Sequence, residues 1–320
     1  MLLISLSLIF GFTLLIWSAD RFISGAMELA YHFSVPPLVI GILVVGFGTS
    51  APELLVSIMA ALQDSTGMAL GNAIGSNITN IALVLGVTAC LTPLVVKQAI
   101  FQREFPLLIF ATLLTWLLIQ DQFLSTLEAG LMMLLMFILL TFMAHSAGDD
   151  QHKNQADNEV DKQPTLVSSL FWLLLGLVLL ITSSNVLVKA AVKLAVLFGI
   201  SDVVIGLTII AIGTSLPELA ASVTGALKHH TDLAVGNIIG SNIFNTLGVI
   251  GVPALISSYA IPDKVLSHDF LVMLALTAAL IVLAFITRKS GGLAKFSGFF
   301  FISCFIAYQV SLYLRTVTSI

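Results

Sequence analysis

Residues 44–58 of this chain read VVGFGTSAPELLVSI, which places a glutamate in the middle of an otherwise apolar segment. Residues 209–223, IIAIGTSLPELAASV, repeat the pattern. The composition makes both glutamates unusual, because 58% of the 320 residues are hydrophobic and only 9% are charged. A carboxylate at the middle of a membrane costs about 2.5–3.5 kcal/mol on insertion scales. Two such residues with the same neighbours therefore indicate a function.

Long apolar stretches recur along the whole chain, and most of them reach the roughly 20 residues that a helix needs to cross a bilayer. A membrane barrel would instead show short segments of alternating polarity. We therefore predict an all-α polytopic membrane protein with ten transmembrane helices, in which the first and sixth extend to residues 31 and 197. The predicted spans cover residues 2–19, 36–62, 68–92, 105–120, 123–144, 167–187, 202–227, 233–257, 269–287 and 293–314.

The sequence also matches itself without a gap at an offset of 165 residues. Residues 41–80 and 206–245 are identical at 20 of 40 positions, mostly Gly, Thr, Ser, Pro, Glu and Asn, so shared hydrophobicity does not explain the match. Five spans separate the two copies, which gives them opposite orientations. Such inverted repeats place a transport site near the membrane midplane between the copies. We predict two inverted five-helix repeats, 1–145 and 166–320.

The charged residues predict how the chain lies in the membrane. With the N-terminus outside, eight Lys and Arg residues fall in inner loops and two fall outside, as the positive-inside rule requires. Both termini are then expected outside. The polar segment 146–165 becomes a cytoplasmic linker, because its acids lack the spacing of a calcium loop. Cys90 and Cys304 lie in apolar segments and predict no disulfide or metal motif.

Within each copy, the polar residues fall at helical spacing. Thr49, Ser50 and Glu53 share one helix face, and Pro52 cannot donate a backbone hydrogen bond, which frees a carbonyl one turn earlier. A loosened helix inside a membrane is tolerated only where it faces protein or a water-lined cavity. The remaining residues of the pattern are Ser76 and Asn80 on the next span, and Thr214, Ser215, Glu218, Ser241 and Asn245 in the second copy.

These side chains are almost all oxygen donors, without Cys or His among them, which disfavours zinc, copper and iron. Hard cations bind such groups, and Ca²⁺ with six to eight oxygen ligands fits best. The two glutamates supply a charge of −2, which one Ca²⁺ or two Na⁺ would balance. A single buried Ser, Thr or Asn usually links helices. The prediction of a cation site therefore depends on the glutamates and on the repetition.

At these residues the chain resembles the sodium/calcium exchangers of the calcium/cation antiporter superfamily, in their prokaryotic ten-span form. The motifs GTSxPE and GNxxGSNIxN match the family's two alpha repeats, here about residues 36–92 and 202–257. The resemblance implies that spans one and six slide against the other helices. It also implies twelve ion ligands, two of them through backbone carbonyls (Gly46 and Ala211): Gly46, Thr49, Ser50, Glu53, Ser76, Asn80, Ala211, Thr214, Ser215, Glu218, Ser241 and Asn245.

Asn245 departs from the family pattern, because many members have an aspartate there, and this leaves two carboxylates instead of three. The resemblance implies a Ca²⁺/Na⁺ antiporter of a prokaryotic cell membrane that is not an enzyme and has no cofactor. Its expected partners are Ca²⁺, Na⁺ and the lipid bilayer, without nucleic acid. Two alternatives stay open, namely coupling to H⁺ (or transport of another divalent cation) and a passive cation channel. An intramembrane enzyme is disfavoured, since the spans lack a His or Cys nucleophile with its base.

Overall fold

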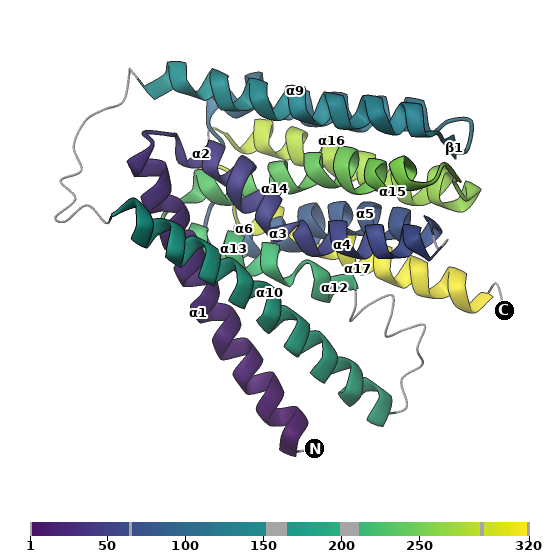
Figure 1. Cartoon of the computed structure of the whole chain (residues 1–320), viewed down its shortest axis with the longest axis horizontal. Coiled ribbons are helices and arrows are strands. Elements are labelled where there is room, and N and C mark those ends of the chain that lie inside the picture. Colours follow the sequence, from purple (N-terminus) through teal and green to yellow (C-terminus); the bar gives the residue numbers. More distant parts are fainter. Residues whose placement is uncertain (1, 64–65, 152–164, 199–210, 289–290, 319–320) are drawn as a thin grey trace.

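The computed structural model describes residues 2–63, 66–151, 165–198, 211–288 and 291–318, and these residues are largely helical (Figure 1). Within them, eight helices are long and apolar enough to cross a membrane, and a bent helix pair is a ninth candidate. The predicted all-α membrane fold is confirmed. The predicted count of ten is not reproduced one for one, because residues 202–210 of the seventh span lie outside the described residues.

Most predicted spans agree with observed elements to within a few residues. Four predicted spans contain or adjoin a π-helical segment, η1, η2, η4 or η5. The observed elements are α1 (Leu2–His32), α5 (Thr66–Thr79) with η2 (Asn80–Leu85) and α6 (Gly86–Leu91), α7 (Gln98–Gln102), α8 (Glu104–Leu118), α9 (Thr126–Gln151), α10 (Leu166–Leu197), α14 (Thr231–Phe244) with η4 (Asn245–Val249) and α15 (Ile250–Ile256), η5 (Val265–Asp269) with α16 (Phe270–Thr287), and α17 (Lys295–Thr318).

Two spans are interrupted where the sequence predicts loosening. In the first copy, α2 (Pro37–Ile40), η1 (Gly41–Gly46) and α3 (Phe47–Thr49) lead to Ser50, where the chain bends by 41° into α4 (Ala51–Leu62). In the second copy, Ser215 separates α12 (Ala211–Thr214) from α13 (Leu216–Leu227). The backbone angles agree, with φ −84° and ψ 3° at Ser50 and φ −89° and ψ 8° at Ser215. Each following helix has a proline in its first two positions, where the missing N–H removes no helical hydrogen bond.

Helices α1 and α10 form a closely packed pair that runs obliquely to the other helices (Figure 1). Two glycines permit this packing. A Cβ atom on Gly176 would lie 2.6 Å from the backbone N of Phe22, and one on Gly25 would lie 2.6 Å from the backbone N of Leu173. Small residues let membrane helices approach closely enough for extensive van der Waals contact.

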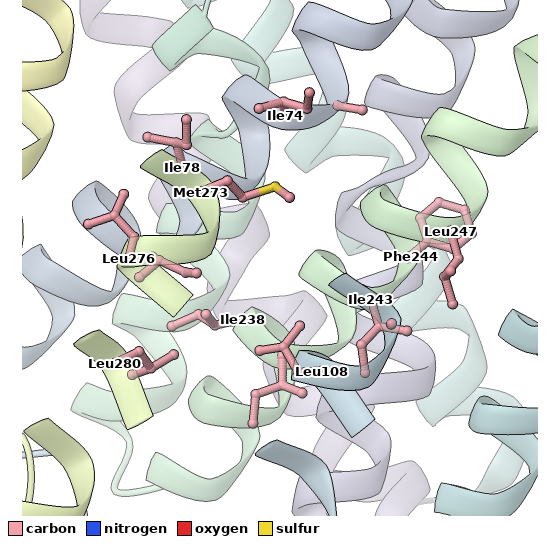
Figure 2. Close-up of a cluster of buried hydrophobic side chains, with 14 of the residues drawn as sticks. Ile74, Ile78, Leu108, Ile238, Ile243, Phe244, Leu247, Met273, Leu276 and Leu280 are labelled. Atoms are coloured by element: carbon pink, nitrogen blue, oxygen red, sulfur yellow. The ribbon is translucent and has the colours of Figure 1, made fainter. Parts of the chain in front are cut away.

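The remaining helices enclose a separate apolar core (Figure 2). Inside a bilayer, close packing stabilises helix association more than the hydrophobic effect does, because lipid tails are as apolar as the core. This core joins helices of both copies, and the side chains labelled in Figure 2 come from α5, α8, α14, η4 and α16: Ile74, Ile78, Leu108, Ile238, Ile243, Phe244, Leu247, Met273, Leu276 and Leu280.

The connecting loops gather at two ends of the bundle. At one end, β1 (Phe123–Leu124) pairs with β2 (Tyr259–Ala260), and Gln122 Nε2 donates to Asp263 Oδ1 at 3.5 Å. These strands correct the predicted fifth span, which began at residue 123, because the helix begins only at Thr126. At the other end, Lys97 forms an ion pair with Asp232. The 26 residues of α9 span about 39 Å at 1.5 Å per residue, which separates the two ends.

Candidate cation-binding site

The two helix interruptions determine where the glutamates lie. Glu53 is in the first turn of α4 and Glu218 in the first turn of α13, and their exposed fractions are 0% and 1%. The N–H groups at a helix start favour negative charge. Ser50, three residues before Glu53, donates a hydrogen bond to Glu218, so both carboxylates lie beside the same helix interruption. A cation could bind between them.

Three serines hydrogen-bond to other predicted site residues at this level, and two of them connect the two copies. Ser50 Oγ donates a hydrogen bond to Glu218 Oε1 at 3.0 Å, and Ser241 Oγ donates to the carbonyl oxygen of Gly46 at 3.2 Å, so both bonds cross between the copies. Ser76 Oγ donates to Glu53 Oε1 at 3.4 Å within the first copy. The predicted site residues of the two copies therefore form one polar cluster.

Several buried polar atoms of this cluster have no hydrogen-bond partner among the described residues. They are the second carboxylate oxygens of Glu53 and Glu218, both amide atoms of Asn80 and of Asn245, and the hydroxyl of Ser215. A buried polar group without a partner costs about 1–3 kcal/mol. Their concentration on predicted ligands is what a site for a desolvated cation requires. Asn80 and Asn245 also begin π-helical segments, which are frequent at functional sites.

The structure brings most of the twelve predicted residues together. Gly46 ends η1, while Ala211 and Thr214 begin and end α12, directly before the second interruption. The other nine predicted ligands are buried, with at most 3% of each residue exposed, as ligands of a desolvated cation should be: Thr49, Ser50, Glu53, Ser76, Asn80, Ser215, Glu218, Ser241 and Asn245. Their oxygen atoms could hold Ca²⁺ or Na⁺, and nitrogen enters only through the two amides.

Two asparagines were not predicted, although both belong to the repeated GN motif. Asn72 Nδ2 donates to the backbone oxygen of Glu53 at 2.9 Å and to Ser57 Oγ at 3.1 Å. Asn237 Nδ2 does the same in the second copy, to Glu218 O at 3.3 Å and Ser222 Oγ at 2.8 Å. The repeat itself carried a signal for them, because each asparagine follows its glutamate by 19 residues.

Comparison with known proteins identifies the family. The family model described as sodium/calcium exchanger protein matches residues 3–145 and 168–314, which is nearly the whole chain. The chain belongs to the sodium/calcium exchanger family. It is a multi-pass membrane antiporter of this family, whose members transport ions.

The similarity to individual members extends from end to end. The putative antiporter CaxA of Alkalimonas amylolytica is 45% identical over 98% of this chain and 99% of its own length. The inner membrane protein YrbG of Escherichia coli (strain K12) is 37% identical over 98% of both chains. A solved structure of the sodium-calcium exchanger NCX_Mj superimposes with a TM-score of 0.82 at 30% identity, and covers 97% of this chain and 98% of its own. The fold predicted for an exchanger of this family is therefore confirmed.

Proposed function

We propose that the chain exchanges Ca²⁺ for Na⁺ by binding the two ions in turn between Glu53 and Glu218. One observation carries the proposal, namely the buried oxygen atoms that have no partner among the described residues: two carboxylate oxygens, two amide oxygens and one hydroxyl. They lie on elements that contact one another, because α4 contacts η4 and α13 contacts η2. All twelve residues predicted above are proposed as the ligand set.

Charge balance explains how one site could couple the two ions. Two carboxylates carry −2, which one Ca²⁺ or two Na⁺ neutralise. An uncompensated buried charge is strongly unfavourable, so the helices would rearrange only when a full complement of cations is bound. Because both ions would use the same oxygens, they would compete. Competition at a site that opens to one side at a time yields exchange without a further gate.

Sodium is proposed as the coupling ion because the similar protein NCX_Mj is named a sodium-calcium exchanger. A proton could also neutralise one carboxylate, which makes Ca²⁺/H⁺ exchange the second candidate. The third is a passive channel, and the close-packed pair α1 and α10 favours a carrier over it, because a rigid unit can slide as a whole. The site would open to each side of the membrane in turn as α1 and α10 slide together.

Equilibrium binding tests the proposed site directly. Radioactive Ca²⁺ bound to the purified protein in detergent should be displaced by Na⁺, with an apparent Ca²⁺ affinity that falls as Na⁺ rises. K⁺ at the same ionic strength is the control. Displacement by lowering the pH, with Na⁺ without effect, would favour the H⁺ candidate. Simultaneous binding of both ions without competition would contradict a shared site.

We also propose that both termini lie outside a prokaryotic inner membrane, as two inverted repeats, 1–145 and 166–320, joined by a cytoplasmic linker at 146–165. The similar protein YrbG is named an inner membrane protein. Single cysteines at Asp121 and Asp263, in a background without Cys90 and Cys304, should react with an impermeant thiol reagent added outside. One in the segment 149–162 should react only after permeabilisation. The opposite pattern would invert the orientation.

A further inference from the structure

Asn237 makes contact with the candidate ligands of both copies. It lies in α14 with an exposed fraction of 0%, and it forms hydrogen bonds with residues in or beside the cluster. Its Nδ2 donates to the backbone oxygen of Glu218 at 3.3 Å and to Ser222 Oγ at 2.8 Å. Its Oδ1 lies 3.2 Å from Thr49 Oγ1, which belongs to the first copy.

The contact with Glu218 determines the orientation of the amide. A backbone carbonyl only accepts hydrogen bonds, so the nitrogen of Asn237 must face Glu218 and the oxygen must face the other way. The other way is toward Thr49. A contact within the second copy therefore fixes the orientation of the Asn237 amide. The amide oxygen then accepts a hydrogen bond from Thr49 of the first copy.

The Thr49 hydroxyl has a single proton and three acceptors near it. They are the carbonyl oxygens of Val45 at 3.0 Å and Gly46 at 3.4 Å, and Asn237 Oδ1 at 3.2 Å. A hydroxyl binds a cation through its lone pairs, so its proton has to point away from the ion. The carbonyl of Gly46 is itself a proposed ligand, so Val45 O and Asn237 Oδ1 are the acceptors that can hold the proton away from the ion before it arrives, which lowers the reorganisation that binding requires.

We infer that Asn237 is a positioning residue for cation binding, which orients the Thr49 hydroxyl and fixes the backbone of Glu218 at the same time. This inference rests on the proposed function, because it takes Thr49 and Glu218 as ligands. Asn72 has the equivalent contacts with Glu53 and Ser57, which indicates that an asparagine fixes the backbone of the glutamate in both copies. Asn237 additionally accepts a hydrogen bond from Thr49, a proposed ligand of the opposite copy.

A double-mutant cycle tests the inference in proteoliposomes that contain the full chain. Asn237→Leu keeps the approximate shape of the side chain and removes its hydrogen bonds, and should raise the KM for Ca²⁺ about tenfold with little change in maximal rate. Thr49→Val should also raise the KM. In the Thr49→Val background, Asn237→Leu should raise the KM by less than about threefold, because the hydroxyl that it orients is gone.

The control is Thr277→Val. Thr277 is buried in α16, and its Oγ1 donates to Met273 O one turn earlier, so its loss should leave the KM near the wild-type value. If Asn237→Leu does not fold, Ser222→Ala replaces it, because it removes one of the two acceptors that hold the amide nitrogen. This variant should raise the KM about threefold, and again less in the Thr49→Val background.

The transport results distinguish a failure of this inference from a failure of the proposed ligand set. If Thr49→Val raises the KM but Asn237→Leu, or Ser222→Ala in its place, does not, the inference is overturned and the proposed site stands. The same holds if the effects of the two substitutions are fully additive. If Thr49→Val transports like the wild type, or the wild type does not transport Ca²⁺, the proposed ligand set is wrong and the inference falls with it.

Discussion

Glu53 and Glu218 follow the same motif and the same helix interruption, yet their carboxylates have different partners. Glu218 accepts a hydrogen bond from Ser50 of the opposite copy at 3.0 Å. Glu53 accepts one from Ser76 of its own copy, at the longer distance of 3.4 Å. Ser215, the counterpart of Ser50, has a buried hydroxyl without a partner among the described residues. The repeated motif sets the backbone, whereas the arrangement of the two copies determines what each carboxylate contacts.

The surroundings of α1 and α10 differ between the copies as well. Lys228 Nζ forms an ion pair with Asp20 Oδ1 at 2.6 Å and donates to Ser24 Oγ at 2.7 Å, which ties α1 to the turn between α13 and α14. At the offset of 165 residues, Asp20 corresponds to Asn185 and Lys228 to Gln63, so the second copy cannot form this ion pair. Among the described residues, this ion pair therefore distinguishes the surroundings of α1 from those of α10.

The largest effect is expected from removing either carboxylate charge. Glu53→Gln and Glu218→Gln should each lower Ca²⁺ transport at least a hundredfold, because a divalent ion in a low-dielectric site loses one of two strong attractions. Both variants should also unfold at a higher temperature without ions, since a desolvated charge is removed. Transport in proteoliposomes and thermal unfolding in detergent measure the two effects.

Glu128→Gln is the control for these substitutions. Glu128 accepts hydrogen bonds from the backbone N and the hydroxyl of Ser125 at the start of α9, and a glutamine can accept them too. It should transport like the wild type. Transport near the wild-type rate by Glu53→Gln or Glu218→Gln would show that the altered glutamate is not a ligand.

Effects of intermediate size are expected from Ser50 and Ser215, because removing their hydroxyls should change the free energy of unfolding differently. Ser50→Ala removes a hydrogen bond to a buried carboxylate and should lower the free energy of unfolding of the ion-free protein by about 1.5–3 kcal/mol. Ser215→Ala removes a hydroxyl without a partner and should leave that stability unchanged or raise it. Thermal unfolding in Na⁺-free buffer with a Ca²⁺ chelator compares them. Equal losses of stability would mean that the two copies are equivalent in solution.

The smallest effect is expected at the ion pair of Lys228. Both side chains are partly exposed, at 31% and 45%, and such pairs contribute about 1 kcal/mol or less, screened by salt. Lys228→Gln should therefore change the ratio of the Ca²⁺ KM values measured from the two sides by at most about fivefold, and less at high salt. Oriented proteoliposomes measure both sides. An unchanged ratio at low salt would mean that the link does not favour either state.

Much of the fold could be predicted from the sequence, because span length and hydropathy depend on local composition. The interruption in the first copy followed from Pro52, and the repeated motif places Pro217 at the equivalent position of the second copy. The strands at Phe123 and Tyr259 were missed, since two residues in a loop carry no periodic signal. They form only because two distant loops meet at the same end of the bundle.

The residues of the candidate site could be predicted from the sequence, but the hydrogen bonds between them could not. Helical spacing relates Thr49 to Glu53 within one copy, and the offset of 165 residues relates the copies to each other. Neither relation indicates that the hydroxyl of Ser50 donates to Glu218, whereas that of Ser215 has no partner among the described residues. Asn72 and Asn237 were overlooked because a buried asparagine between helices is usually structural, and their role depends on the backbone oxygens that they contact.

Ion flux driven by defined gradients tests the central claim most directly. Proteoliposomes loaded with Na⁺ and diluted into Na⁺-free buffer with trace radioactive Ca²⁺ should accumulate Ca²⁺, and excess external Na⁺ should suppress the uptake. Two Na⁺ for each Ca²⁺ would leave uptake indifferent to a K⁺-valinomycin potential, whereas a third Na⁺ would make it respond. Ca²⁺ uptake driven by a pH gradient as strongly as by the Na⁺ gradient would contradict sodium coupling, and dissipation of a Ca²⁺ gradient without any counter-ion would contradict exchange itself.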